Sequence, residues 1–252
     1  MRIGDTIIAV ESCSSTSDLA REAATGGAEE GMVFVSREQK HGRGTRGKSW
    51  FSAKDKGLYA SIILRPPESH LSLVPLLAGL AVRDAVKEET QVDVELRWPN
   101  DIVWKSCKLG GILCESEFMG NELRFLIVGI GLNISHKKVD FPPHIRNLAT
   151  SLKIICGKAP QTPLLLSALC RALNGWYSSF LEGKNEGIIS SFQESSSIPQ
   201  GARVSLFSSG QEVEGSYRGL DPRGGLVLEE SGKRRSFLAA EVKGINIVNR
   251  GG

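Results

Sequence analysis

Apolar runs and turn residues predict alternating strands and helices in the N-terminal part of the chain. "TIIAV" at residues 6–10 is typical of a short buried strand, and the run from Ser15 to Gly27 has the polar start, apolar spacing and glycine stop of a helix. "GMVFVSREQ" from residue 31 and "GLYASIILRPP" over residues 57–67 predict two further strands, and two prolines end the second of them.

A helix packed on a sheet is predicted from Leu71 to about Glu89, where apolar residues recur every three or four positions. Pro75 fits only the first turn of that helix. Three closely spaced strands follow, "VELRW", "CKLGGILCESEF" and "ELRFLIVGIGLN", and "MGN" joins the last two in a hairpin. Short strands with tight turns and few intervening helices predict an α+β fold with a mixed, largely antiparallel sheet flanked by helices.

The pattern changes near the segment "ESSSIPQG". Before it, an irregular stretch over residues 134–147 precedes helical patterns at 162–183 and 187–192. After it, brief strands alternate with glycine-bearing turns as far as "INIVN", which predicts a small β-barrel of about fifty residues. We therefore divide the chain into a domain of residues 1–197 and a C-terminal domain of residues 198–252.

The composition is that of a folded protein rather than a disordered one. Of the 252 residues, 40% are hydrophobic and 23% are charged, and the formal charge of +3 is spread along the chain, so it neither requires nor excludes a nucleic-acid partner. The N-terminus "MRIGDTIIAV" carries charges too early for a secretory signal, and no apolar run approaches the roughly 20 residues of a membrane span. Because the five cysteines form no C-x-x-C pair, we expect reduced thiols. Together these features predict a cytoplasmic protein without membrane attachment.

Residues 39–50, "QKHGRGTRGKSW", concentrate glycines and cations in one loop. Backbone N–H groups freed by the glycines, together with two arginines and a lysine, suit the oxygens of a phosphate or a carboxylate. The spacing is neither that of a P-loop nor that of a dinucleotide-binding turn. Taken alone, such a loop is more often a solvated basic surface.

Two further stretches carry candidate chemistry. "RWPND", residues 97–101, offers Asn100 to a ribose or phosphate oxygen and Asp101 to Mg²⁺ or a base, although Pro-Asn-Asp is also ordinary turn chemistry. "KLGGILCE" places Lys108 before two glycines, and "VGIGLN" places two more glycines on the partner strand. Glycines inside strands mark the close approach of a ligand or of another backbone, and a bulge or a sheet crossing is the alternative.

In this order and with these gaps, "GRGTRGKSW", "RWPND", "KLGGILCE" and "GIGLN" resemble the motifs of the biotin–protein ligase family. "GLDPRGGLVLEE" resembles part of that family's small SH3-like C-terminal domain, so the resemblance spans nearly the whole chain. It implies the ligase catalytic fold, related to class II synthetases. It also implies an enzyme that uses ATP and Mg²⁺ to convert biotin to biotinyl-5′-AMP, and then transfers biotin to a lysine of a biotin carboxyl carrier protein domain in a carboxylase.

The resemblance assigns roles to individual residues. Lys108 looks like the family's catalytic lysine, Arg43 and Asp101 are implied to assist it, and Asp101 is the implied Mg²⁺ ligand. An apolar wall for biotin would come from Trp50, Gly111, Ile112 and Leu113. The residues implied for biotin binding are Ser15, Thr16, Ser17, Gln39, Arg43, Gly44, Thr45, Trp50, Lys108 and Gly111. The residues implied for the nucleotide are Arg43, Arg46, Trp98, Asn100, Asp101 and Asn133.

Three positions depart from the family pattern. Ser17 stands where members often have asparagine, and Arg97 replaces the usual lysine before Trp98, which keeps the charge but not the geometry. Thr45 stands where many members have an arginine that is associated with ordering the loop and retaining the adenylate. Because one charge-assisted contact is missing at Thr45, we expect the adenylate to be held less firmly than in relatives.

The remaining expectations concern partners and alternatives. The first predicted strand begins at about Thr6, so we expect no N-terminal DNA-binding domain and no specific operator binding. The resemblance makes a homodimer through the central sheet reasonable. The alternative enzyme is a lipoate or octanoate ligase or transferase of the same fold, and the alternative from another class is a non-catalytic module whose loop grips the phosphates of RNA or a nucleotide.

Overall fold

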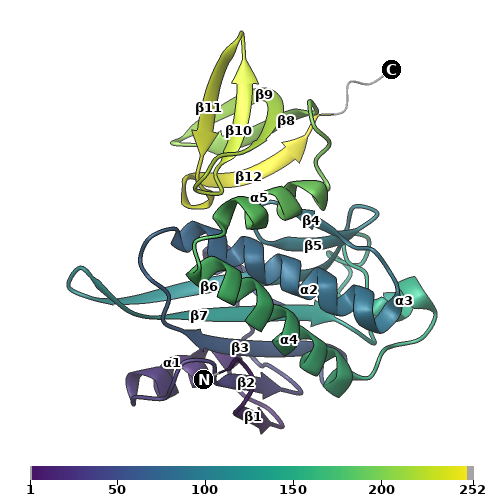
Figure 1. Ribbon diagram of the computed structural model, residues 1–252. Coiled ribbons are helices and arrows are strands. Elements are labelled where there is room, and N and C mark those ends of the chain that lie inside the picture. The colour runs from purple at the N-terminus through teal and green to yellow at the C-terminus, as the bar shows by residue number, and fades with distance from the viewer. Residues whose placement is uncertain (1, 249–252) are drawn as a thin grey trace.

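A seven-stranded sheet forms the larger part of the molecule in the computed structural model, which describes residues 2–248 (Figure 1). Its strand order is β1-β2-β3-β7-β6-β5-β4, in which β1 and β2 are parallel and the other neighbours are antiparallel. The prediction of a mixed, largely antiparallel sheet is confirmed. The strands are β1 (Ile7–Val10), β2 (Val33–Ser36), β3 (Gly57–Leu64), β4 (Glu95–Arg97), β5 (Asp101–Trp104), β6 (Cys107–Met119) and β7 (Glu122–Asn133).

Helices cover the two faces of this sheet unequally (Figure 1). On one face, α2 and α4 build the main core with alternate strand residues such as Ile62 and Leu64. On the other face, α1 covers only a small cluster that includes Ile63 and Phe34, so part of this face is left free for a site. The helices are α1 (Thr16–Thr25), α2 (Val74–Thr90), α3 (Leu152–Cys156), α4 (Thr162–Leu181) and α5 (Asn185–Glu194).

The capping signals in the sequence set the helix ends. Ser15 is the N-cap of α1, where its side chain accepts a hydrogen bond from the N–H of Ser17 at 3.3 Å. Pro75 lies in the first turn of α2, as predicted, but α2 begins at Val74 because residues 71–73 form a separate 3₁₀ turn. None of the helices among residues 2–248 is both long enough and apolar enough to cross a membrane.

Two short elements are missed by the sequence patterns. β5 begins at Asp101, directly after the turn of "RWPND", and pairs between β4 and β6. α3 has five residues, begins after the N-cap Ser151 and ends at Gly157, whose φ is 78°. Runs of four or five residues are too short for hydrophobic periodicity to identify.

The C-terminal part is a five-stranded antiparallel sheet in the order β11-β10-β9-β8-β12, which lies over α5 in Figure 1. Its ties to the larger part include the side chains of Ser72 and Trp98, which donate hydrogen bonds to the carbonyls of Arg223 and Gly224. The predicted domains of residues 1–197 and 198–252 include Met1 and residues 249–252, which lie outside the described residues. The last residue of the predicted strand "INIVN" lies outside them too. The strands are β8 (Arg203–Ser208), β9 (Gln211–Leu220), β10 (Leu226–Glu230), β11 (Lys233–Phe237) and β12 (Val242–Ile247).

Candidate active site

A small cavity lies between the start of α1, the loop of residues 39–50 and the middle of β6 and β7; we call it the first cavity. The structure brings together all ten residues that the sequence suggested for biotin binding, since each of them lines it. The other lining residues are Ala60, Asn100, Ile112, Leu113, Gly129 and Ile130.

Glycines in the two central strands make room for the indole of Trp50. Gly111 of β6 and Gly131 of β7 are register partners. A Cβ atom on Gly131 would lie 2.5 Å from Cε2 of Trp50, and one on Gly111 would lie 3.5 Å from its Cζ3. The close approach predicted at these glycines is therefore that of a side chain of the loop, which forms an aromatic wall of the cavity.

The opposite side of the cavity is a set of ordered hydroxyl and amide groups. Oε1 of Gln39 accepts hydrogen bonds from the backbone N–H of Thr16 at 2.9 Å and from its hydroxyl at 3.1 Å. The buried hydroxyl of Ser61 lies 2.8 Å from that of Thr16 and 3.1 Å from that of Ser17. Ser61 is not singled out by the sequence, because nothing in an apolar strand pattern distinguishes a serine that supports a site.

A lysine–carboxylate pair stands at the other end of the cavity. Nζ of Lys108 lies 2.5 Å from Oδ1 of Asp101 and 5.5 Å from the centre of the Trp50 ring. The register between β5 and β6 shifts next to Lys108, between Ile102 and Val103, and this irregularity accompanies the turn of its side chain toward Gly111.

A second and larger cavity, of about 650 Å³, opens between the two sheets. It shares Thr45, Asn100, Lys108 and Ile112 with the first cavity, so Lys108 stands where the two meet. Cationic side chains dominate its charged lining, because Asp101 is the single carboxylate among the described residues that line it. The cations are Arg46, Lys48, Arg97, Lys108 and Lys243.

The C-terminal sheet contributes to this second cavity, which the sequence does not predict. Lys243 and Asn246 of β12 line it, together with Ala239 and Ala240 just before that strand. The guanidinium of Arg46 donates a hydrogen bond to the carbonyl of Ala239 at 3.0 Å, so the glycine-rich loop touches the C-terminal part.

Two residues suggested for nucleotide binding, Asn133 and Trp98, have buried side chains that donate hydrogen bonds to backbone carbonyls. Asn133 lines neither cavity, since its buried amide donates a hydrogen bond to the carbonyl of Thr150 at 3.0 Å. Trp98 lines the second cavity but is only 2% exposed, and its indole N–H donates to the carbonyl of Gly224 at 2.9 Å. Trp98 therefore secures the C-terminal part beside the cavity.

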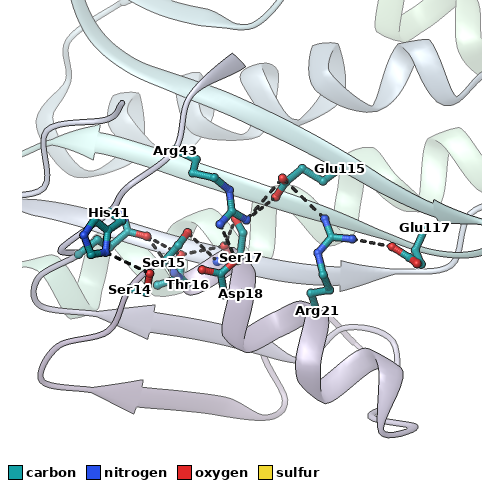
Figure 2. A network of polar contacts seen from close by, with 12 residues as sticks. Ser14, Ser15, Thr16, Ser17, Asp18, Arg21, His41, Arg43, Glu115 and Glu117 are labelled. Atoms are coloured by element: carbon teal, nitrogen blue, oxygen red, sulfur yellow. Dashed lines mark hydrogen bonds and ion pairs between the residues drawn. The ribbon is translucent and has the colours of Figure 1, made fainter. Parts of the chain in front are cut away.

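Arg43 does not extend into the second cavity. Its guanidinium forms ion pairs with Asp18 of α1 and with Glu115 of β6, the latter at 3.1 Å (Figure 2). Burial acts to lower the pKa of Arg43, but the hydrogen bonds and charges of the two carboxylates outweigh it and raise that pKa. Cys114, which lines the second cavity, is no nucleophile near neutral pH, because burial raises the pKa of its thiol to about 12.

Comparisons with known proteins match both parts of the chain. The model of the Biotin/lipoate A/B protein ligase family matches residues 9–133, and that of the Biotin protein ligase C terminal domain matches residues 201–243. The bifunctional ligase/repressor BirA of Bacillus subtilis is 28% identical over 245 residues, which cover 96% of this chain and 74% of that protein. The biotin–[acetyl-CoA-carboxylase] ligase of Mycobacterium tuberculosis is 28% identical over 242 residues, covering 93% of this chain and 87% of that protein.

A solved structure resembles nearly the whole chain. The biotin protein ligase from Aquifex aeolicus, in complex with biotin and ATP, superposes with a TM-score of 0.85 at 27% identity, covering 97% of this chain and 100% of that chain. The fold and the site thus define a two-part ligase, in which a mixed catalytic sheet carries a small C-terminal antiparallel sheet. The chain belongs to the biotin/lipoate A/B protein ligase family.

Proposed function

We propose that this chain activates biotin with ATP to give biotinyl-5′-AMP and pyrophosphate, and then transfers the biotinyl group to a lysine of a biotin carboxyl carrier protein. The observation that carries this proposal is the position of Lys108 where the two cavities meet. A carboxylic acid in the first cavity and a nucleotide in the second would present their reacting groups to the same ammonium. The second cavity's other cations suit a triphosphate.

The first cavity has the chemistry that biotin requires. Its hydroxyl and amide groups at Thr16, Ser17 and Gln39 suit the ureido ring, and the face of Trp50 suits the thiophane ring and the valeryl chain. Nε1 of Trp50 is buried without a hydrogen-bond partner among residues 2–248, so it offers a donor that a polar ligand can satisfy. The Ser17 hydroxyl offers one donor, where the amide of an asparagine would offer two.

The reaction needs cations because two anions must meet. An oxygen of the biotin carboxylate attacks the α-phosphorus of ATP, the bond to the bridging oxygen breaks, and pyrophosphate leaves. Lys108 first neutralises the carboxylate and then the negative charge that grows on the α-phosphate. In the second step the amine of the carrier lysine attacks the acyl carbon, loses a proton and expels AMP.

The Mg²⁺ that accompanies ATP has little protein ligation here. No group of three metal-ligating side chains occurs among the described residues, and Asp101 is already paired with Lys108. Mg²⁺ keeps several waters and is commonly bound through substrate phosphates plus one or two carboxylates. We propose that the nucleotide carries the ion and that Asp101 supplies at most one ligand, where the ion would neutralise phosphate charge.

A homodimer through the central sheet is proposed as well. β1 is an edge strand of the seven-stranded sheet, and Ile7 and Ile8 on it are 43% and 40% exposed. An exposed apolar edge favours pairing with another chain. Light scattering would show twice the monomer mass for wild type, and the monomer mass for an Ile8→Lys variant. A monomeric wild type would contradict the dimer.

The test of the enzymatic proposal is pyrophosphate release by purified protein given Mg·ATP and one acid, namely biotin, lipoate or octanoate. We expect release with biotin alone. Release with lipoate or octanoate and none with biotin would assign the chain to the lipoate branch of the family. Nucleotide binding without release for any acid would identify a non-catalytic module.

A further inference from the structure

The guanidinium of Arg43 is shared between carboxylates of two elements that are far apart in the sequence (Figure 2). One terminal nitrogen bonds Asp18 on α1, and the other lies 3.1 Å and 3.4 Å from the two oxygens of Glu115 on β6. The side chains of Arg43 and Glu115 are 35% and 23% exposed and that of Asp18 is 44% exposed, so the contact with Glu115 is the partly desolvated one. Charge-assisted hydrogen bonds of this kind are stronger than neutral ones.

The position of the cluster argues against a role for it in binding a substrate anion. Gly111 and Glu115 lie on the same face of β6, and four residues of strand separate them by roughly 13 Å. The cluster is therefore at the end of the first cavity away from Lys108, and its two carboxylates would repel a substrate anion. In this arrangement Arg43 holds the loop. The cations available to bind anions include Lys108, at the junction of the two cavities, and Arg46, in the second cavity.

We propose that Asp18 and Glu115 are positioning residues that hold Arg43, and through it the loop of residues 42–48, over the first cavity. The ligand named for that cavity rests on the proposed function, but the holding of the loop does not. Three cations in seven residues repel one another, so ordering this loop needs neutral surroundings for at least one of them.

The other contacts of the loop fix its shape more than its position. The N–H groups of Gly44 and Trp50 donate to the carbonyls of Lys48 and Gly42 at 2.7 Å and 2.8 Å, and all four residues lie within or next to the loop. Arg46 reaches Ala239 through an exposed hydrogen bond, which water can replace. The Arg43 cluster is the partly buried tie from the loop to α1 and β6.

The neighbouring pair supplies a matched control. Arg21 of α1 and Glu117 of β6 form an ion pair at 2.6 Å, which joins the same two elements without touching the loop (Figure 2). Arg21 also lies 3.6 Å from Glu115, so Glu115→Gln loosens this second contact of Arg21 while its closer pair with Glu117 remains. Glu117→Gln therefore removes a carboxylate from the same surface, while Arg43 keeps both partners. Asp18→Asn with Glu115→Gln removes both partners of Arg43 and keeps the side-chain shapes.

The experiment measures trypsin cleavage of the folded, ligand-free protein at the bond between Arg46 and Gly47, by mass spectrometry over time. Cleavage follows the population of the open loop. We expect the double variant to be cut about tenfold faster than wild type, and Glu117→Gln to match wild type within about twofold. Arg43→Gln should reproduce the double variant, and combining all three changes should add nothing further.

Ligand binding gives a second readout that a general loss of stability would not produce. We expect the double variant to raise the KM for biotin about tenfold with kcat within about threefold of wild type, because closing the loop then costs binding energy. Position 43 lies in a loop outside the hydrophobic core, so Arg43→Gln keeps the test decisive if the double variant fails to fold. Trypsin cleavage of Arg43→Gln at the wild-type rate would overturn the proposal. So would cleavage of Glu117→Gln as fast as that of the double variant. Absence of pyrophosphate release would overturn only the proposed function.

Discussion

Nζ of Lys108 and Oδ1 of Asp101 are 2.5 Å apart at the junction of the two cavities. Both side chains are partly buried, at 39% and 25% exposure. Removing one partner of such a pair leaves the other charge poorly solvated, so Asp101 keeps the ammonium in place until a substrate anion competes for it. The same ion pair therefore stabilises the folded site and positions the ammonium for the reaction.

Replacing Lys108 with alanine should lower the rate of adenylate formation by about a hundredfold or more, because a fixed cation at the developing charge is lost. Single-turnover pyrophosphate release measures this rate. Lys105→Ala is the control, since Lys105 lies nearby in the turn before β6 but its ammonium faces Trp104, 4.5 Å from the ring centre. A near-normal rate for Lys108→Ala would remove this lysine from the mechanism.

Thr45 lines both cavities, where an arginine would add a cation beside the reacting groups. We expect Thr45→Arg to slow the release of biotinyl-5′-AMP by about tenfold to a hundredfold, since one charge-assisted contact contributes about 1.5 to 3 kcal/mol. Stopped-flow or filter-retention measurements of the off-rate test this. Thr45→Gln adds length without charge and should leave the off-rate near that of wild type. No slowing in Thr45→Arg would refute the looser retention that we infer.

Gly131→Ala should weaken biotin binding more than Gly111→Ala does. The new Cβ at position 131 would lie 2.5 Å from a Trp50 ring atom, whereas at position 111 the nearest atom, in the flexible Lys108 side chain, is 3.3 Å away. Overpacking of this kind costs about 1 to 3 kcal/mol, which corresponds to a roughly fivefold to 150-fold higher Kd. Calorimetric titration with biotin would measure both variants, and equal affinities would show that Trp50 does not form the cavity wall.

His136 makes the stability of the protein depend on pH. Its ring is fully buried and stacked on Phe141, with centroids 4.7 Å apart, and neither ring nitrogen has a hydrogen-bond partner among residues 2–248. Burial lowers the pKa of His136 from 6.5 to about 4. The unfolded chain therefore binds a proton in this interval that the native chain does not, so stability decreases as the pH falls from about 6.5 toward about 4.

Urea unfolding at about pH 7 and about pH 5 tests the effect of His136, which we expect to be about 2 kcal/mol less stability at the lower pH. His136→Phe should remove most of this difference, because phenylalanine preserves the stacking and does not titrate. The control is His144→Gln, since His144 is exposed and its replacement should leave the difference unchanged. A His136→Phe variant with the full wild-type difference would contradict the assignment.

Local sequence signals predicted those parts of the fold in which neighbours in the chain decide the structure. The cap at Ser15, the proline in the first turn of α2 and the long strands β6 and β7 are confirmed, because each depends on a run of adjacent residues. At Asp101 the sequence predicts only a turn and misses β5, since four residues beside "RWPN" give no measurable period.

The site was predictable where a motif holds its residues together and not where distant segments meet. The motifs pointed to Lys108 and the loop, but nothing near Ser61 or Lys243 in the sequence connects them to the cavities. The ion pairs of Arg43 with Asp18 and Glu115 span 25 and 72 positions, so they could only be seen in the fold. The same holds for Trp98, whose indole binds a carbonyl 126 positions away.

We infer that Lys108 brings two substrates together, a carboxylic acid and a nucleotide, and that the acyl group is then transferred to a protein. The most direct measurement incubates the protein with Mg·ATP, biotin and a purified biotin carboxyl carrier domain, and records the mass of that domain. We expect a mass increase equal to one biotinyl group on a single lysine, abolished by omitting ATP and strongly slowed by Lys108→Ala. An unchanged carrier mass with no biotinyl-5′-AMP in the mixture would contradict it.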